Sequence, residues 1–162
     1  MSIKDSGNRT EFESGAVRDM QEGKGRCDLL PLDIVAEIEL GAYGRVFGAI
    51  ERFQNTGDVF HLFKALDTFA DVAFGNFYTM LLEVAKHFEE GAKKYSPNNW
   101  KLGINVEVYI NSGVRHLLKW LRNDDDEPHD RAFCWNIVCA IWTCRHLPHL
   151  NDYAVKESVS GD

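Results

Sequence analysis

Apolar residues recur at helical spacing through most of this chain. The clearest stretch covers residues 59–73, where the apolar side chains fall on one wide face of a helix. The same spacing predicts helices over residues 77–95, 105–122 and 131–147, and a weaker pattern interrupted by glycines suggests another over 32–53. No stretch alternates polar and apolar residues as a half-buried strand would. The sequence therefore predicts an all-α fold with four to five helices.

Length and charge limit the classes of protein to which this chain can belong. The chain has 162 residues, which suits a single domain covering residues 1–162, and its 44% hydrophobic and 27% charged residues are typical of a soluble globular protein. A net charge of -7 argues against nucleic acid or a membrane surface as a partner, because both favour excess Lys and Arg. Residues 1–13 look like a loose polar tail, without a secretory signal. The four cysteines lack C-x-x-C spacing, so we expect a reducing cytoplasm.

The segment EVAKHFEEGAKKYSPNNW, residues 83–100, is where side chains suited to catalysis or ligand binding are most concentrated. On a helix, Glu83, His87 and Glu90 fall on one stripe beside an apolar face. An ordinary charged helix surface, held by pairs worth about 0.2–0.5 kcal/mol each, explains this segment equally well when it is taken alone. Further candidates follow towards and beyond the helix end at Pro97, namely Lys93, Lys94, Asn99 and Trp100.

A second acidic group lies in the segment NDDDEPHD at residues 123–130. Pro128 suits the first turn of a helix, where acids are favoured by the helix dipole, so capping is one interpretation. Glu127 and Asp130 also form E-x-x-D, which places two carboxylates one turn apart where they can share a divalent ion. One acid is enough for a cap, whereas this segment has five.

Cations gather in two places despite the acidic balance of the chain. Residues 14–31 combine glycines with three cations in a pattern that suits a phosphate group, although a solvated linker remains an alternative and the spacing is not that of a P-loop. The predicted helix over 105–122 collects four more cation-capable residues on one side. The candidates in these two segments are Arg18, Lys24, Arg26, Arg115, His116, Lys119 and Arg122.

These clusters suggest one site. Carboxylates projected from facing helices repel one another, so a shared divalent cation is expected, and oxygen ligands suit Mg²⁺ or Mn²⁺. Cations beside such a cluster point to a polyphosphate as the substrate.

Several strings resemble a known family. These are GKGRCDLLP, LEVAKHFEEGAKKYSPNNWKLG and YINSGVRHLLKWLRNDDDEPHDRAFCWN with the following AIWT. They resemble the phage dATP/dGTP pyrophosphohydrolases of the MazZ type, a branch of the all-α MazG-like nucleoside triphosphate pyrophosphohydrolases. The resemblance covers residues 14–31, as a nucleotide-binding strap, and 77–148, as catalytic helices. Residues 39–76 look like a helical insertion relative to shorter relatives.

The resemblance implies a MazG-like helix bundle that hydrolyses purine deoxynucleoside triphosphates to the monophosphate and pyrophosphate. The family uses E-x-x-E followed by E-x-x-D to hold two or three Mg²⁺ or Mn²⁺ ions. Glu127 and Asp130 match the second motif, whereas Lys86 stands where the first would need an acid after Glu83. A homodimer or homotetramer is implied, as is a supply of dGMP for a phage that replaces adenine by 2-aminoadenine. The metal and catalytic candidates are then Glu83, His87, Glu90, Glu127 and Asp130.

The resemblance also suggests roles for the remaining candidates. The cations would hold the phosphates, Trp100 or Tyr95 could stack on the base, and Asn98 or Asn99 could read its edge. Two alternatives remain open. The doublet His129-Asp130, together with His87 or His116, could belong to a helical HD-type phosphohydrolase that releases triphosphate, and the chain could also be a non-catalytic helical oligomerisation module.

Overall fold

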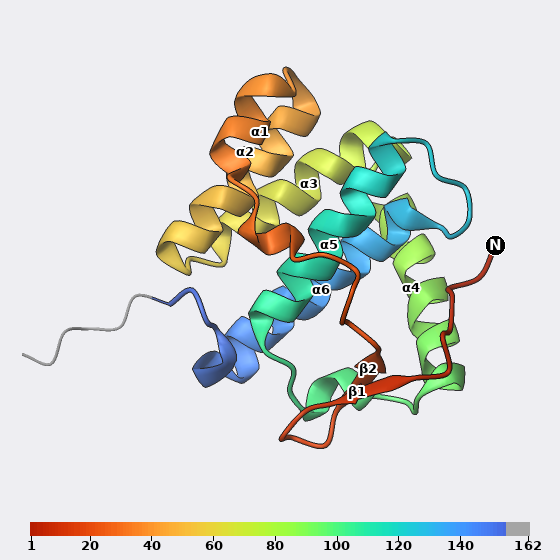
Figure 1. Cartoon of the computed structure of the whole chain (residues 1–162). Coiled ribbons are helices and arrows are strands. Elements are labelled where there is room, and N and C mark those ends of the chain that lie inside the picture. Colours follow the sequence, from red (N-terminus) through yellow and green to blue (C-terminus); the bar gives the residue numbers. More distant parts are fainter. Residues whose placement is uncertain (155–162) are drawn as a thin grey trace, which may run out of the picture.

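Helices dominate the computed structural model, which describes residues 1–154 (Figure 1). The all-α prediction is confirmed. Short 3-10 helices lie at Cys27–Leu29 (η1), Asn99–Leu102 (η2) and Pro148–Leu150 (η3). Within the described residues the α-helices are α1 (Leu32–Ile38), α2 (Ala42–Thr56), α3 (Phe60–Phe74), α4 (Phe77–Lys94), α5 (Val106–Leu121) and α6 (His129–His146).

There are six helices in this range rather than four to five, because the segment predicted over residues 32–53 breaks after α1. Gly41 adopts a φ of 93°, which L side chains rarely adopt. At Gly44 a Cβ would lie 1.9 Å from the carbonyl oxygen of Glu39, so only glycine permits this close turn between α1 and α2. The glycines that weakened the helical pattern are therefore the residues that divide it.

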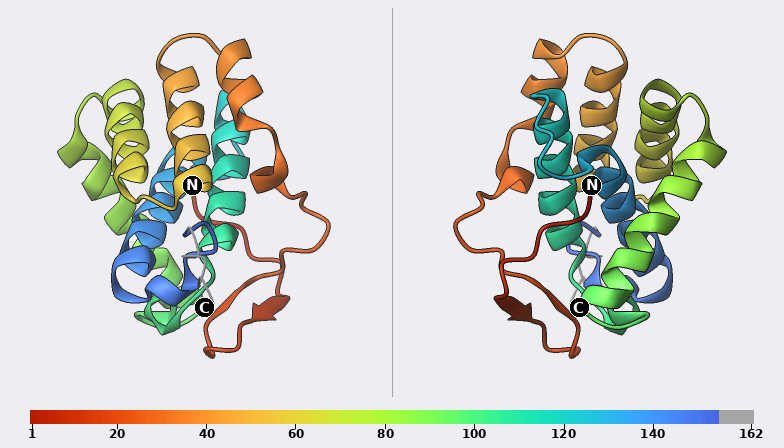
Figure 2. Two further views of the ribbon diagram at one scale, coloured as in Figure 1. Left: turned by 90° about the vertical axis from the view of Figure 1, so that its left-hand side faces the viewer. Right: turned by 90° about the vertical axis from the view of Figure 1, so that its right-hand side faces the viewer.

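The core lies around α5 and α6, which pack against each other through the middle of the molecule (Figures 1 and 2). α3 and α4 pack on α6, and α2 packs on α3. Phe69 of α3 contacts Phe133 of α6 with ring centroids 4.7 Å apart, and both are fully buried. Residues 39–76 include α2 and α3, so this range contributes to the core; its status as an insertion stays a prediction. Within residues 1–154 no helix combines the length and apolarity needed to cross a bilayer.

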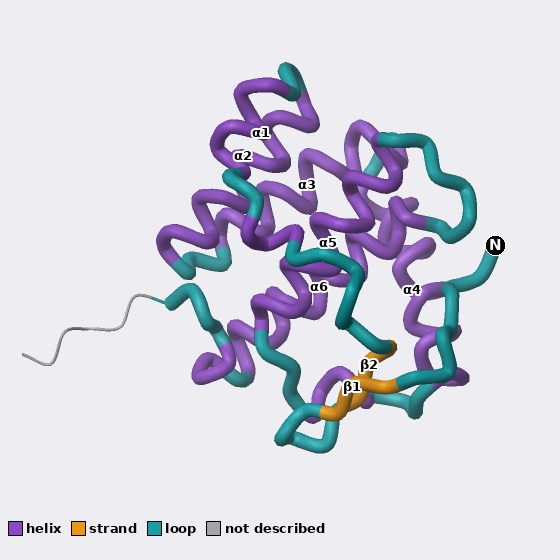
Figure 3. Tube along the Cα trace, viewed as in Figure 1, coloured by secondary structure: helices purple, strands orange, loops and turns teal. Residues whose placement is uncertain are grey.

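A small antiparallel sheet, β1 (Arg9–Glu11) and β2 (Val17–Asp19), lies beside η2 (Figure 3). The expectation that residues 1–13 form a loose tail, and that the chain has no strand, was wrong here. Three-residue strands are too short for alternation to be visible in a sequence. They are fixed by a distant side chain: the Asn99 amide accepts from the Val17 N–H at 2.9 Å and donates to the Val17 carbonyl at 2.8 Å.

Candidate active site

Carboxylates from two helices meet in one cleft of about 640 Å³, which we call the acidic cleft. It lies between α4, the loop joining α5 to α6, and the start of α6. The four predicted catalytic acids all line it, namely Glu83, Glu90, Glu127 and Asp130. The helical spacing of α4 brings its two acids to the same side as the E-x-x-D pair, as the site hypothesis requires.

Of the acids near α6, Asp130 satisfies an amide of the first turn. Pro128 occupies the N-cap position and offers no side-chain acceptor. Asp130 accepts the amide of Arg131, the third residue of the helix, at 2.8 Å. Asp126 instead accepts from Lys4 Nζ at 2.5 Å and from His129 Nε2 at 2.6 Å, which hold its pKa well below the usual range. The capping interpretation therefore applies to Asp130 and does not account for Glu127, which accepts the Lys4 amide.

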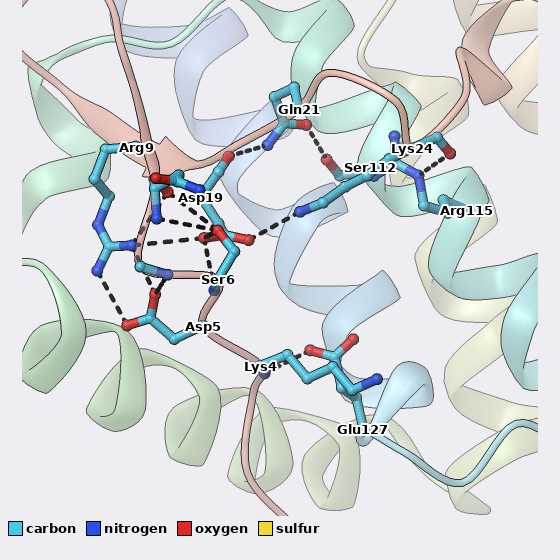
Figure 4. A network of polar contacts seen from close by, with 12 residues as sticks. Lys4, Asp5, Ser6, Arg9, Asp19, Gln21, Lys24, Ser112, Arg115 and Glu127 are labelled. Carbon is cyan, nitrogen blue, oxygen red and sulfur yellow. Dashed lines mark hydrogen bonds and ion pairs between the residues drawn. The ribbon is translucent and has the colours of Figure 1, made fainter.

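The N-terminal segment covers two of the four acids. The Ile3 amide donates to Glu90 Oε2 at 2.9 Å, and the Lys4 amide donates to Glu127 Oε1 at 2.7 Å (Figure 4 draws Lys4 and Glu127). Arg131 also pairs with Glu90 at 2.5 Å. Although burial favours the neutral acid, these two donors lower the pKa of Glu90 below its ordinary value. Both carboxylates accept backbone donors that a cation could replace.

On α4 the remaining polar residues divide between two sides. Lys86, which stands where the resemblance calls for an acid, pairs with Glu83 at 2.6 Å. His87 lines a second cleft and is not among the residues of the acidic cleft. Its ring lies 5.2 Å from that of Trp135. Burial, with Arg131 nearby, lowers the pKa of His87 to about 3, so its imidazole is neutral.

The second cleft, of about 1190 Å³, has seven Lys or Arg residues and four aromatic rings among its lining, and we call it the cationic cleft. Glu127 lines both clefts, so they meet at this residue. Two predicted phosphate ligands do not line either cleft: Arg26 pairs with Asp28 at 2.7 Å, and Lys93 points outwards beside Glu89. The predicted residues that do line it are Arg18, Lys24, Lys94, Asn99, Trp100, Arg115, His116, Lys119 and Arg122.

Arg18 is the cation that reaches deepest towards the core. Both of its terminal nitrogens donate to Asn136 Oδ1 at 3.2 Å, and its guanidinium lies over Tyr109 at 5.3 Å and Trp135 at 5.5 Å. Asn136 Nδ2 donates to the Ala132 carbonyl, which turns Oδ1 towards Arg18. Within residues 1–154 Arg18 forms no ion pair with an acid, so its charge is available to an anion. Asn136 had no predicted role; its polarity within an apolar helix was the available signal.

The glycine-rich strap, residues 14–31, is held by hydrogen bonds to α5 and by an ion pair of its own Lys24 with Asp19 of β2 (Figure 4). Arg115 donates to the carbonyls of Lys24 at 3.2 Å and Gly25 at 2.9 Å, and Gln21 contacts Ser112. Lys24 itself pairs with Asp19 at 2.9 Å. Arg115 therefore holds the strap in place, and the linker interpretation of residues 14–31 does not describe these contacts.

Several predicted base contacts already have structural partners. The side-chain amide of Asn99 accepts a hydrogen bond from the Val17 N–H and donates one to the Val17 carbonyl. The Tyr95 hydroxyl accepts from the Asp19 amide at 2.7 Å, with Arg9 over the ring at 5.0 Å. Trp100 packs edge-on against Trp142 with centroids 4.9 Å apart.

His116 does not act as a cation. It is largely enclosed, and burial together with neighbouring His129 lowers its pKa well below the ordinary value. Its Nδ1 lies 2.9 Å from Nδ1 of His129. The polar side of α5 thus offers three cations and one neutral imidazole to the cleft.

The donor type in the acidic cleft suits a hard divalent ion, but within residues 1–154 no three of the four predicted acids bring ligand oxygens within 4.8 Å of one another. All four predicted acids present oxygen ligands, which Mg²⁺ and Mn²⁺ prefer. Within residues 1–154 Glu127 accepts one backbone amide and pairs with no cation, so ligand capacity remains.

Comparison with known proteins agrees with this chemistry. A family profile described as dATP/dGTP diphosphohydrolase, N-terminal, matches residues 68–153, a little over half of the chain, and this range contains all four acids. No curated protein and no solved structure matched the chain. From the family match we conclude that the chain belongs to the dATP/dGTP diphosphohydrolase family of nucleoside triphosphate pyrophosphohydrolases.

Proposed function

We propose that this protein hydrolyses dGTP and dATP to the monophosphate and pyrophosphate with the help of Mg²⁺ or Mn²⁺ in the acidic cleft. The observation that carries the proposal is the position of Glu127, which lines both the acidic cleft and the cationic cleft. A triphosphate held by cations in one cleft would present its α-phosphorus to the carboxylates of the other. Water then adds to that phosphorus, the bond to the bridging oxygen breaks, and pyrophosphate leaves with the electron pair.

Two or three ions held by Glu83, Glu90, Glu127 and Asp130 would supply an activated water and neutralise phosphate charge. The residues of the chain itself do the binding. Arg18, without an acidic partner within residues 1–154, is suited to a phosphate oxygen, and Lys119 and Arg122 on α5 line the same cleft. Such fixed cations stabilise charge that develops as the phosphate bond breaks.

For base recognition we propose the aromatic wall of the cationic cleft. Trp100 and Tyr95 both line it, and either can offer a ring to a purine. Of the two amides considered, Asn98 is the better reader of the base edge, because Asn99 already bonds both backbone groups of Val17. Asn98 is exposed and lies in the left-handed region with a φ of 62°.

The resemblance to MazZ-type enzymes supports a finer proposal. A phage that replaces adenine by 2-aminoadenine needs dGMP as a precursor and low dATP, and this reaction would provide both in the host cytoplasm. We also propose a homodimer or homotetramer. Exposed apolar side chains on α3 and α4 support this, including Phe60, Phe63, Tyr78, Leu81 and Leu82.

The direct test is to incubate the protein with each of the four dNTPs and Mg²⁺ or Mn²⁺, and to separate the products by chromatography. We expect the purine monophosphates and pyrophosphate. Release of intact triphosphate with a nucleoside would instead favour the HD-type alternative. Absence of hydrolysis with all four dNTPs and either ion would favour the non-catalytic module.

A further inference from the structure

Two histidines from successive helices face each other where the two clefts meet. His116 on α5 and His129 at the start of α6 place their Nδ1 atoms 2.9 Å apart. The side chain of His129 is fully buried. One ligand atom from each histidine and a carboxylate oxygen of Glu127 all lie within 4.8 Å of one another. Three donors, from α5, the loop that follows it and the start of α6, thus converge.

The other nitrogen of His129 is tied to a carboxylate. Its Nε2 lies 2.6 Å from Asp126 Oδ1, and because a carboxylate only accepts, this nitrogen carries the proton. His129 Nδ1 therefore presents its lone pair towards His116 and Glu127. A histidine that ligates a metal typically has this arrangement, with the remote N–H held by a carboxylate that fixes the tautomer.

The spacing of the two imidazoles also fits a shared ion. Two nitrogens at about 2.05 Å from one ion lie about 2.9 Å apart at a right angle and about 3.3 Å apart at a tetrahedral angle. The observed 2.9 Å falls at the first of these values. Without an ion, His116 Nδ1–H donates to His129 Nδ1. Binding an ion requires His116 Nδ1 to lose this proton and both rings to turn so that their lone pairs converge on the ion.

A competing group of donors around His129 is less suitable. Asp124, Asp126 and His129 also offer ligand atoms within 4.8 Å of one another. However, Asp126 pairs with Lys4 at 2.5 Å and Asp124 pairs with Arg122 at 2.5 Å, so both carboxylates are already neutralised. Within residues 1–154 Glu127 forms no ion pair with a cation.

We propose that His116, His129 and Glu127 bind one borderline divalent ion such as Zn²⁺ or Co²⁺, with Asp126 as the partner that orients His129. Imidazole ligands favour these ions over Mg²⁺, which prefers oxygen. The site shares Glu127 with the oxygen-rich acidic cleft but uses a different donor set. It does not depend on the identity of the nucleotide substrate.

The test uses the full-length, metal-free protein and Co²⁺, in excess Mg²⁺ so that the oxygen-rich site is occupied. Binding is followed by the visible absorption of Co²⁺. We expect one bound Co²⁺, an affinity at least about tenfold lower in Asp126→Ala, and a larger loss in His116→Asn. Glu83→Gln and His149→Asn serve as controls, because the first alters only the acidic cleft and the second removes an exposed histidine of η3. Both should bind Co²⁺ as the parent does.

Proton NMR of the Co²⁺ form gives a readout that is independent of the variants. Two ligating imidazoles should produce two exchangeable, strongly shifted N–H signals, and one should disappear in His116→Asn. No Co²⁺ binding, no shifted exchangeable signals, or unchanged binding in His116→Asn would each overturn the proposal. If the parent hydrolyses dGTP with Mg²⁺ alone yet fails this test, the histidine site is refuted and the proposed function stands; if Co²⁺ binds but no dNTP is hydrolysed, the reverse holds.

Discussion

Arg131 places Nη2 2.5 Å from Oε1 of Glu90, which joins α6 to α4 at the edge of the acidic cleft. Its side chain is almost fully buried, whereas that of Glu90 is a quarter exposed. Glu90 therefore differs from Glu127, which within residues 1–154 accepts a single backbone amide, at 2.7 Å. We infer that Glu127 is the more accessible ligand for an ion and that Glu90 must share its charge with Arg131.

Glu127→Gln and Asp130→Asn should each reduce pyrophosphate release from dGTP by at least about 100-fold. A metal ion supplies several kcal/mol of transition-state stabilisation, and each 1.4 kcal/mol corresponds to tenfold in rate. The far-UV circular dichroism should stay helical in both variants. Asp67→Asn, on an exposed position of α3 outside both clefts, is the charge-matched control. Full turnover in both cleft variants would remove these acids from the proposed mechanism.

Arg18→Met should raise the KM for dGTP by about tenfold or more, because a hydrogen bond to a charged group contributes about 1.5–3 kcal/mol. The same change leaves the buried Asn136 Oδ1 without its donor, so the free energy of unfolding should also fall, by about 1–3 kcal/mol. Steady-state kinetics and urea unfolding measure the two quantities. Arg52→Met, on the exposed side of α2, should change neither. An unchanged KM in Arg18→Met would show that this cation does not meet the substrate.

Asn99→Ala should destabilise the hairpin rather than change base preference. It leaves the N–H and carbonyl of Val17 without partners, at a cost of about 1–3 kcal/mol for each buried group. Hydrogen exchange should therefore accelerate at the Val17 amide. Asn99→Asp keeps the acceptor and should protect that amide better than Asn99→Ala. A shift in the ratio of dGTP to dATP turnover with unchanged exchange would instead assign Asn99 to the base.

Stability should fall as the pH drops below 6.5, partly because of His87. Its pKa is about 3 in the folded protein against an ordinary value of 6.5, so the unfolded chain binds a proton that the folded chain does not. Each such proton costs the folded state about 1.4 kcal/mol per pH unit between these two values. His116, whose pKa is also lowered by burial, acts in the same direction.

The His87 contribution can be isolated with His87→Gln, which should flatten the dependence of the urea midpoint on pH between pH 6.5 and 5. The exposed His149 provides a matched variant, His149→Gln, with the parental slope. An identical slope in His87→Gln would mean that the imidazole titrates freely in the folded protein.

Deleting residues 2–4 should lower the Mn²⁺ concentration needed for half-maximal binding. The deletion removes the two amides that occupy Glu90 and Glu127. Lys4→Ala removes only the ion pair with Asp126 and keeps both amides, so it should change Mn²⁺ binding less. Electron paramagnetic resonance of free Mn²⁺ measures both. Weaker binding after the deletion would show that this segment helps to build the ion site.

The sequence was sufficient to predict the helices with the strongest apolar period. All four predicted acids line the acidic cleft, and their joint role in a metal site stays a prediction. α4 ends at Lys94, one residue before its predicted limit, and α5 lies one residue inside its predicted range at each end. Local periodicity fixes these features, because a helix face is decided by residues three and four apart. It also placed Glu83 and Glu90 on the face that meets α6.

The features that were missed depend on distant partners. Arg26 and Lys93 are exceptions, because each lies beside an acid close in sequence, Asp28 and Glu89, and neither lines a cleft. The hairpin was missed because its docking partner is 82 residues away. Periodicity carries no information on such pairs.

The docking of β2 has a consequence for the order of folding. The position of Val17 depends on its hydrogen bond to Asn99. That of Arg18 depends on its hydrogen bond to Asn136, which is 118 residues further along the chain. Contacts of such wide separation close large loops and so form late. During synthesis, the segment that carries Arg18 leaves the ribosome before Asn99 and Asn136 and can take its position only after the first half of α6 has emerged. The nascent chain would therefore complete the cationic cleft in one late assembly step, after α4 and α5 have formed.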